Sequence, residues 1–553
     1  MSAAGASNLA GGQASAVYDA VIIGAGFGGM YMLHRLRQLG LSARVYDRAS
    51  DVGGTWYWNR YPGARCDVES MQYSYSFSPE LQQEWKWSEK FSAQPEILAY
   101  ARHVADRFDL RRDIQLETTI ASAHYDAGDR RWRITTDGGE TVSARFCVMA
   151  TGCLSTARTP DFEGLQDYRG DTYHTGYWPH EPVDFSGMRV GVIGTGSSAI
   201  QAIPVIAEQA AHVTVFQRTP NYSIPSRNGP MTDDYEQSWK QDYEALRAKA
   251  RMTRNGILAN ANDQSALDVD EAERQAIYEQ RWADGGTRFM AAFKDLATNA
   301  DSNETAAEFV REKIRETVND PEMAELLAAK DYPIGTKRIC VDTHYFETFN
   351  RDNVELVDIR NAPIDRLTAS GLEQGGRAFA FDAIVFATGF DAMTGTLDAI
   401  DIRGREGLAL RNEWQAGPRT YLGMMSAGFP NLFMITGPQS PSVLSNMMVS
   451  IEQHVDWMTD CVAHMQAEAL DVIEPTRAAQ DGWVEHSNEV AYSTLYPRAA
   501  SWYMGANIPG KPRIFLPYIG GVGDYREKCS AIAAKNYEGF VFEQSSSSTV
   551  AAE

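Results

Sequence analysis

The sequence has no apolar run long enough to cross a membrane. A membrane-spanning helix needs about 18 or more consecutive apolar residues, and no stretch of the 553 residues approaches that length. The first 16 residues are small and polar, without the basic and then apolar layout of a secretory signal peptide. We therefore expect neither a transmembrane segment nor secretion.

Cysteine is also sparse, and its positions do not cluster. No C-x-x-C pair occurs and no cysteine stands among histidines, which excludes a structural zinc site and a redox dithiol. Scattered cysteines in a large chain are typical of the reducing cytosol, so we expect a cytoplasmic protein without a metal. The six positions are Cys66, Cys147, Cys153, Cys340, Cys461 and Cys529.

Basic residues are too few to balance the acidic ones. The chain has 51 Lys and Arg against 73 Asp and Glu, a formal net charge of −22. Nucleic acids and anionic membranes are bound by basic surfaces, so we expect neither as a partner. Small-molecule partners remain, and we expect a monomer or a weak homo-oligomer of roughly two to four domains.

A strand, a glycine-rich turn, a helix and a second strand follow one another near the N-terminus. Residues 18–23 are apolar and β-branched, the G-x-G-x-x-G spacing occupies 24–29, and 42–46 read as the second strand. The glycines permit a tight turn and let a pyrophosphate approach a helix N-terminus, while a carboxylate after the second strand binds ribose hydroxyls. Asp47 takes that place. The unit predicts a dinucleotide site, which takes FAD rather than NAD if residues 53–56 contact an isoalloxazine ring.

The same order of elements recurs about 170 residues later. A strand at 188–193 leads into a glycine motif at 194–199, whose third glycine is replaced by alanine, as the fingerprint allows. After the next strand, Arg218 stands where the first unit has a carboxylate. The planar fork of a guanidinium suits a 2′-phosphate, so the second unit predicts NADP, with Lys337 as a second positive charge.

The segments around these units complete an α/β fold of two Rossmann-like dinucleotide-binding domains, for FAD and NADP. Residues 231–330 are charged and have helical periodicity, which predicts a helical insertion in the NADP domain. Buried strands at 146–152 and 383–389 are expected to close the domains, near the places where the chain crosses between them. We assign 17–152 and 388–540 to the FAD domain, 153–230 and 331–387 to the NADP domain, 231–330 to the insertion, and 1–16 and 541–553 to disordered tails.

Two longer patterns resemble the signatures of the type I Baeyer–Villiger monooxygenases. Residues 168–179 read Y-x-G-x-x-x-H-x-x-x-W-P, with tyrosine at the place of the usual phenylalanine. Residues 53–67 read G-G-x-W-x-x-x-x-Y-P-G-x-x-x-D, which matches every specified position of a second signature. The resemblance extends over about 17–540 and is nearest to the phenylacetone and cyclohexanone monooxygenase branch.

This resemblance implies a flavoprotein that uses NADPH and O2 to convert ketones to esters or lactones. In that family NADPH reduces FAD, O2 forms a flavin C4a-peroxide, and the peroxide attacks the ketone carbonyl to give a tetrahedral adduct. An oxygen anion in a dry site needs a fixed positive charge, and the resemblance implies Arg338 as that cation and Asp67 as its anchor. Sulfoxidation would be a further activity.

The resemblance also implies roles for residues outside the glycine motifs. Tyr73 and Met447 would lie near FAD, and Trp502 would contact the nicotinamide nucleotide when the loop at 497–517 closes and excludes water. The expected domain-linking residues are Gly170, His174, Trp178 and Asp391. The expected substrate contacts are Ser440, Pro441, Ser442, Val443 and Leu444. The predicted cofactor contacts are Gly24, Gly26, Phe27, Gly29, Asp47, Thr55, Trp56, Tyr57, Asp67, Tyr73, Met447, Gly194, Thr195, Gly196, Ser197, Ser198, Gln201, Arg218, Thr219, Lys337 and Trp502.

Other functions compete with this one. A flavin N- or S-oxygenating monooxygenase shares both glycine motifs, but its fingerprint usually lacks a tryptophan at the place of Trp178 and it does not need Arg338. A disulfide or quinone reductase requires a redox cysteine pair beside the first site, which the sequence does not have. A non-catalytic nucleotide sensor would bind flavin without consuming NADPH faster when a ketone is added.

Overall fold

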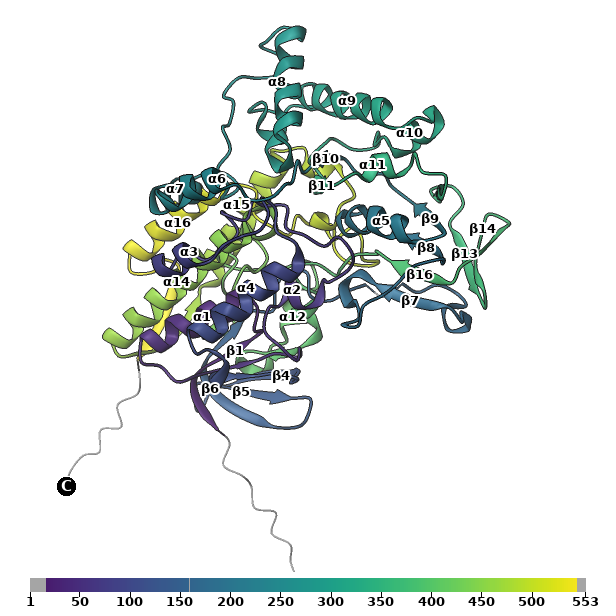
Figure 1. Cartoon of the computed structure of the whole chain (residues 1–553). Coiled ribbons are helices and arrows are strands. Elements are labelled where there is room, and N and C mark those ends of the chain that lie inside the picture. The colour runs from purple at the N-terminus through teal and green to yellow at the C-terminus, as the bar shows by residue number, and fades with distance from the viewer. Residues whose placement is uncertain (1–15, 159, 545–553) are drawn as a thin grey trace, which may run out of the picture.

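The computed structural model describes residues 16–158 and 160–544, which include two large sheets, one mixed and one wholly parallel (Figure 1). Each of these sheets contributes strands to a separate large hydrophobic core. The tails predicted at 1–16 and 541–553 fall mostly outside these residues. The C-terminal limit was set too early, because Phe540–Gln544 forms strand β20, which pairs antiparallel with β19 (Leu470–Pro475).

The first sheet is centred on β1 (Val17–Ile23), which ends in a run of buried apolar residues. It pairs in parallel with β2 (Ala43–Tyr46) and with β6 (Thr141–Met149). The order is β17-β4-β5-β6-β1-β2-β3, and β18 also pairs with β6. The other strands are β3 (Ile114–Gln115), β4 (Ile120–Asp126), β5 (Arg131–Thr136), β17 (Asp401–Arg403) and β18 (Leu432–Met434).

The second sheet is centred on β8 (Arg189–Ile193), between β9 (His212–Gln217) and β16 (Ala383–Phe386). Its order is β12-β9-β8-β16-β7, and all of its pairs are parallel. The outer strands are β7 (Asp171–His174) and β12 (Val354–Asp358). In both sheets the central strand ends at a glycine motif, and nucleotides bind at the carboxyl ends of strands in such folds.

The remaining strands form small sheets that the sequence did not predict. A three-stranded antiparallel sheet occupies 364–380, and a short parallel pair joins residues 223–225 to 340–342. The strands are β10 (Ser223–Pro225), β11 (Cys340–Asp342), β13 (Ile364–Thr368), β14 (Gly371–Gln374) and β15 (Arg377–Ala380).

Helices α1 (Phe27–Gln38) and α14 (Met447–Ala467) pack together in the first core. Most of helix α14 is buried, because α1, α16 and β19 pack around it. The other helices are α2 (Thr55–Trp58), α3 (Pro79–Glu84), α4 (Gln94–Arg107), α5 (Ser197–Gln209), α11 (Tyr345–Thr348), α12 (Gly395–Ala399), α13 (Leu410–Glu413), α15 (Arg477–Tyr492) and α16 (Val522–Ala534). The 3-10 turns are η1 (Arg111–Asp113), η2 (Leu165–Asp167), η3 (Thr175–Tyr177), η4 (Gly286–Ala291), η5 (Arg405–Gly407), η6 (Ser442–Leu444), η7 (Tyr496–Arg498) and η8 (Trp502–Met504).

The inserted segment is helical, as its periodicity predicts, but its two halves pack on different cores (Figure 1). Trp239 and Tyr243 join the first core, beside α14 and α16, whereas Tyr278 and Phe309 belong to the second core. The first half thus stays with the first sheet. The helices are α6 (Asp233–Lys240), α7 (Tyr243–Arg251), α8 (Glu271–Asp284), α9 (Ala300–Thr317) and α10 (Pro321–Leu327).

The chain crosses between the cores after β6 and again after β16, near the predicted strand ends. The two crossing segments run side by side: Arg158 donates its N–H to the Gly389 carbonyl, and Asp391 donates to the Thr156 carbonyl, both at 2.9 Å. Within the described part of the chain, no helix has the length and apolar character needed to span a bilayer.

Candidate active site

The first glycine motif closes a tight turn between β1 and α1. Gly24 has φ +111° and donates its N–H to the Tyr46 carbonyl at 2.8 Å, and a Cβ on it would collide with the Ala150 carbonyl oxygen. A Cβ on Gly29 would collide with the Gly24 carbonyl, so α1 lies as close to β1 as the backbones allow. The unpaired N–H groups of the first turn of α1 favour a phosphate there.

Asp47 directly follows β2, beside this turn. Its carboxylate accepts the N–H groups of Ala25 at 2.6 Å and Ala49 at 2.8 Å, which fix its orientation. Burial raises the pKa of Asp47, and these two N–H groups oppose the rise. Each carboxylate oxygen can accept a further hydrogen bond, so Asp47 is suited to ribose hydroxyls.

Gly26 and Gly54 bring two glycine segments into contact beside the turn. A Cβ on Gly54, which has φ +54°, would lie 2.8 Å from the Gly26 Cα. Backbone without side chains lets a pyrophosphate or a flat ring approach closely. Buried Trp56 lies next to this surface in the chain and donates its Nε1–H to the hydroxyl of Tyr73 at 3.1 Å. These residues fit FAD.

The second glycine motif has the same backbone connections but more open space. Gly194 has φ +112° and donates to the Phe216 carbonyl at 3.1 Å. A Cβ on Gly196 would meet no atom within 4 Å, and the third position is taken by Ala199, which is fully buried. The second turn therefore has space where the first is covered by Gly54.

Two cations meet beside this second turn. Arg218 follows β9 and is exposed, and the Nζ of Lys337 lies 4.5 Å from the centre of the Tyr332 ring. Burial lowers the pKa of Lys337, and the positive charge of Arg218 lowers it further. A phosphate placed here would relieve that repulsion, so this corner fits the 2′-phosphate of NADP.

The other predicted cofactor contacts lie around the two turns. Phe27 and Tyr57 are buried in the first core and Met447 packs against it, Thr55 and Ser197 are exposed at the starts of α2 and α5, and Thr195 donates its hydroxyl to the Thr219 carbonyl at 2.8 Å.

Arg338 and Asp67, 271 residues apart, form an ion pair between the two domains. The Nε–H of Arg338 donates to Asp67 Oδ2 at 3.0 Å, a second bond from Nη2 reaches the same oxygen, and Nη1 donates to the Val443 carbonyl at 2.7 Å. The hydroxyl of Tyr503 makes a further hydrogen bond with this guanidinium. Burial alone would lower the pKa of Arg338, but Asp67 and Tyr503 hold it above its usual value. The geometry thus fixes a permanent cation.

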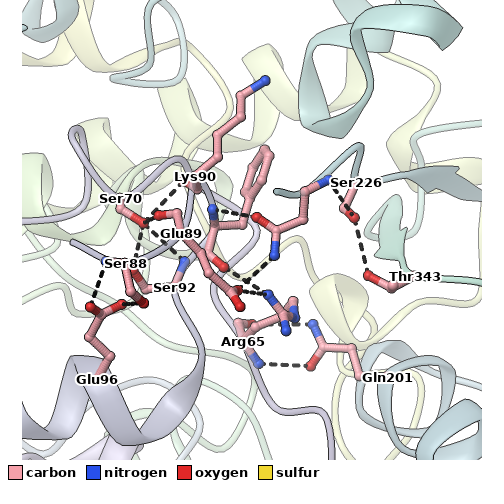
Figure 2. A network of polar contacts seen from close by, with 12 residues as sticks. Arg65, Ser70, Ser88, Glu89, Lys90, Ser92, Glu96, Gln201, Ser226 and Thr343 are labelled. Carbon is pink, nitrogen blue, oxygen red and sulfur yellow. Dashed lines mark hydrogen bonds and ion pairs between the residues drawn. The ribbon is translucent and has the colours of Figure 1, made fainter. Parts of the chain in front are cut away.

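A polar network around Arg65, two residues before Asp67 in the chain, joins the two domains (Figure 2). Gln201 of α5 accepts the Tyr61 hydroxyl at 2.8 Å and donates to the Arg65 carbonyl at 3.2 Å, while the guanidinium of Arg65 donates to Glu89 at 2.7 Å. Ser198 also hydrogen bonds to Tyr61. The side chains of Gln201 and Ser198, predicted as NADP contacts, thus hold the turn before Asp67 against α5.

His174 ties the two crossing segments together. Its Nδ1 accepts the Gly176 N–H at 2.9 Å, so Nε2 carries the proton and faces the Arg158 carbonyl at 3.0 Å and the Thr388 hydroxyl at 3.2 Å. Burial lowers the pKa of His174. A neutral imidazole with both nitrogens occupied is suited to a structural role rather than to proton transfer.

The other fingerprint residues pack around the edge of the second sheet. A Cβ on Gly170 would collide with the Tyr168 ring and lie 2.6 Å from the Asp382 carbonyl. Trp178 is buried, and its ring stacks on Tyr173 with centroids 5.2 Å apart. These contacts bring the fingerprint against β7 and β16.

The segment 501–518, here called the control loop, lies against the crossing segments and the predicted substrate segment. Lys511 pairs with Asp391 and donates to the Ala392 carbonyl at 3.1 Å. On the other side, Gln439 donates its N–H to the Leu516 carbonyl at 2.7 Å. Asp391, predicted as a hinge residue, is therefore bound directly to this loop.

The segment 440–444, predicted to contact the substrate, is largely buried, and its Val443 carbonyl accepts Nη1 of Arg338. Val443 belongs to a small apolar core with Cys153, Met393 and Tyr503, and Leu444, Met447 and Trp502 pack against that core. The hydroxyl of Ser442 lies 2.9 Å from the Cys153 sulfur. The side chains gathered next to the guanidinium are mainly apolar.

The sequence did not predict that Tyr503 and the Val443 carbonyl contact Arg338, or that Lys511 pairs with Asp391. The available signal was the position of Tyr503 next to Trp502 in an aromatic pair. Nothing local predicts that its hydroxyl meets an arginine 165 residues earlier in the chain, because that contact exists only after both domains pack.

Comparisons with known proteins agree with this geometry. Residues 21–261 match the pyridine nucleotide-disulphide oxidoreductase family. A Baeyer–Villiger monooxygenase of Pseudooceanicola batsensis is 43% identical over 95% of this chain and 96% of its own, and a phenazine N-monooxygenase of Lysobacter antibioticus is 42% identical over 97% and 98%. Among solved structures, an oxidised steroid monooxygenase bound to NADP has a TM-score of 0.92 and 53% identity, covering 96% of this chain and 100% of that one. An OTEMO complex with FAD and NADP has a TM-score of 0.92 and 40% identity, with the same coverage.

Proposed function

The chain belongs to the Baeyer–Villiger monooxygenases, FAD- and NADP-dependent enzymes that convert ketones to esters or lactones, and we propose that it oxidises a small apolar ketone with Arg338 as its catalytic cation. The observation that carries the proposal is the guanidinium of Arg338, fixed between Asp67 and the Val443 carbonyl at the junction of both dinucleotide domains.

The first domain is proposed to hold FAD, which when bound and reduced by NADPH supplies the activation of O2 for transfer of one oxygen atom. The glycine turn at 24–29 and the N-terminus of α1 bind its pyrophosphate, and Asp47 binds its ribose. Arg218 and Lys337 bind the 2′-phosphate of NADPH at the second turn, where their mutual repulsion favours an anion.

Arg338 places positive charge where negative charge develops on oxygen during the transfer. A preorganised charge in a water-poor site is worth about 3–4 kcal/mol of barrier, because it needs no reorganisation at the moment of reaction. Asp67 fixes the plane of the guanidinium through two bonds to one carboxylate oxygen. The control loop, through Trp502, covers this site and excludes water.

The substrate is proposed to lie against segment 440–444 and the small apolar core around Val443. These side chains favour a largely apolar ketone whose carbonyl points to Arg338. Oxygen transfer to sulfur would use the same site. Nitrogen oxygenation is a second candidate, since one relative of this chain is a phenazine N-monooxygenase.

The domain division proposed from the sequence is compatible with the two cores, with the first half of the insertion packed on the FAD side. We also propose a reducing compartment, the cytoplasm, because all six cysteines are free and buried.

A ketone panel tests the function. Purified enzyme with bound FAD is given NADPH, O2 and cyclic, linear, aryl or steroid ketones, and products are identified by mass spectrometry. We expect esters or lactones, with NADPH consumption that rises with ketone. Oxidation of phenazines, amines or sulfides with no ester from any ketone would replace this proposal by the N- or S-oxygenating one.

A further inference from the structure

We propose that Tyr503 is a positioning residue that couples the seating of the control loop to the orientation of Arg338. The inference rests on the proposed role of Arg338 and adds a residue that the sequence patterns did not indicate. Tyr503 lies in η8, directly after Trp502, and only 2% of it is exposed. Its hydroxyl hydrogen bonds to the Arg338 guanidinium.

The position of the tyrosine ring is set by the loop around it. Leu516 donates its N–H to the Tyr503 carbonyl at 2.7 Å, and the ring packs against Phe515 and Tyr496 with centroids 6.2 and 5.9 Å away. The hydroxyl therefore reaches Arg338 only when both arms of the loop are folded together. The control loop therefore folds against the domains and Tyr503 contacts the Arg338 guanidinium in the same step.

Tyr503 holds the guanidinium differently from Asp67. Burial raises the pKa of Tyr503, while Arg338 opposes the rise, so the phenol stays neutral. A neutral oxygen accepts a guanidinium N–H without cancelling the positive charge, whereas the carboxylate of Asp67 offsets part of it. Nε, Nη2 and Nη1 donate three bonds to Asp67 and Val443, and Tyr503 takes a fourth.

The same loop is bound to the crossing segments and to the substrate segment. Lys511 pairs with Asp391, and Asn507 donates to the Phe390 carbonyl at 2.7 Å. A rotation of one domain against the other would displace these two contacts and the loop with them. The displaced Tyr503 would then change the orientation of the Arg338 guanidinium. If two events are coupled in this way, weakening either one weakens the other.

A double-mutant cycle on loop opening tests this coupling without using activity. Arg513 is exposed in the loop and precedes Ile514, so trypsin can cleave after it when the loop opens. The FAD-loaded enzyme with NADP+ is digested, and cleavage rates are compared for wild type, Tyr503→Phe, Arg338→Met and the double variant. Tyr496→Phe is the matched control, since its ring lies in the same cluster and contacts Tyr503.

We expect Tyr503→Phe to raise the cleavage rate about fivefold, the loss of roughly one hydrogen bond. Arg338→Met should raise it by at least as much, the double variant no more than Arg338→Met, and Tyr496→Phe less than twofold. Effects that multiply in the double variant, or Tyr503→Phe equal to Tyr496→Phe, would overturn the proposal. If Arg338→Met loses FAD, Arg338→Lys replaces it in the cycle.

Steady-state kinetics of the same variant provide a second test of the proposal. Tyr503→Phe should lower kcat for the ketone about tenfold and divert NADPH oxidation to hydrogen peroxide, with KM for the ketone changed less than twofold. A rise in KM at unchanged kcat would mean that Tyr503 only shapes the substrate pocket. Lack of ester from the wild type would refute the proposed function, whereas the cleavage cycle would still decide the coupling.

Discussion

The two glycine turns have the same backbone connections and differ in what surrounds them. In each, the first glycine donates its N–H to the end of the neighbouring strand, at 2.8 Å for Gly24 and 3.1 Å for Gly194. The first turn is covered by Gly54, while Gly196 in the second turn has open space around it. The carboxylate of Asp47 follows the first, and the exposed cation Arg218 follows the second.

We infer from this difference that the first turn holds a resident cofactor and the second an exchanging one. A nucleotide enclosed by two backbone segments can leave only when the structure opens, whereas one bound at an open turn through surface cations can exchange in every cycle. We therefore expect changes in the first turn to affect stability and flavin content, and changes in the second to affect only KM for NADPH.

The largest expected effect is at Gly24. In Gly24→Ala the methyl group collides with the Ala150 carbonyl and the residue cannot keep φ +111° without strain. We expect the free energy of unfolding to fall by about 3–5 kcal/mol, with almost no bound FAD. Absorbance at 450 nm per protein and a urea titration measure both quantities.

Gly196→Ala is the control for that variant. Its methyl group meets no atom of the chain within 4 Å, so FAD content and unfolding should stay at wild-type values while KM for NADPH rises. Equal loss of FAD in both variants would show that the two turns do not have separate tasks.

Acid should destabilise the first domain next most strongly. His454 is fully buried there, accepts the Thr436 N–H at Nδ1, and has a pKa that burial lowers to about 3. It stays neutral in the folded protein but protonates near pH 6.5 when unfolded. Stability is therefore lost as pH falls below 6.5, by about 1.4 kcal/mol per pH unit down to about 3.

Urea-induced release of FAD at pH 7.5, 6.5, 5.5 and 4.5 measures this dependence. His454→Asn keeps an acceptor for the Thr436 N–H and removes the titrating group, so its stability should fall less steeply with acid than that of the wild type. Parallel slopes for the two proteins would assign the acid sensitivity to other groups.

The smallest expected effect belongs to the open turn. Arg218→Ala removes the cation proposed for the 2′-phosphate, and KM for NADPH should rise about 10- to 100-fold, the value of a charged hydrogen bond. KM for NADH should change less than twofold, since NADH has no 2′-phosphate. An equal rise for both nucleotides in steady-state kinetics would remove Arg218 from the phosphate site.

The sequence predicts those features that are formed by residues close to one another in the chain. The strand, turn and helix order, the glycine spacings, Asp47 and Arg218 lie within short units, so the two nucleotide domains and their helical insertion follow from local patterns. The ion pair of Arg338 with Asp67 spans 271 residues and could be expected only from the resemblance to a family.

Contacts that depend on domain packing were beyond local patterns. The Tyr503 hydroxyl, the Lys511–Asp391 pair and the split of the insertion between two cores arise when distant segments meet. Helix α14 gives another example: the buried carboxylate of Glu452 accepts the N–H of Ser76 at 2.5 Å, a partner far away in sequence.

The most direct measurement is the amount of ester formed per NADPH oxidised by Arg338→Ala. With FAD still bound, this variant should keep oxidising NADPH while ester formation falls at least about 100-fold and hydrogen peroxide replaces it. Arg338→Lys should retain more ester formation than Arg338→Ala, since it keeps a charge without the two-pronged bond to Asp67. Ester formation by Arg338→Ala within a few-fold of wild type would show that the fixed cation at the domain junction is not what makes oxygen transfer possible.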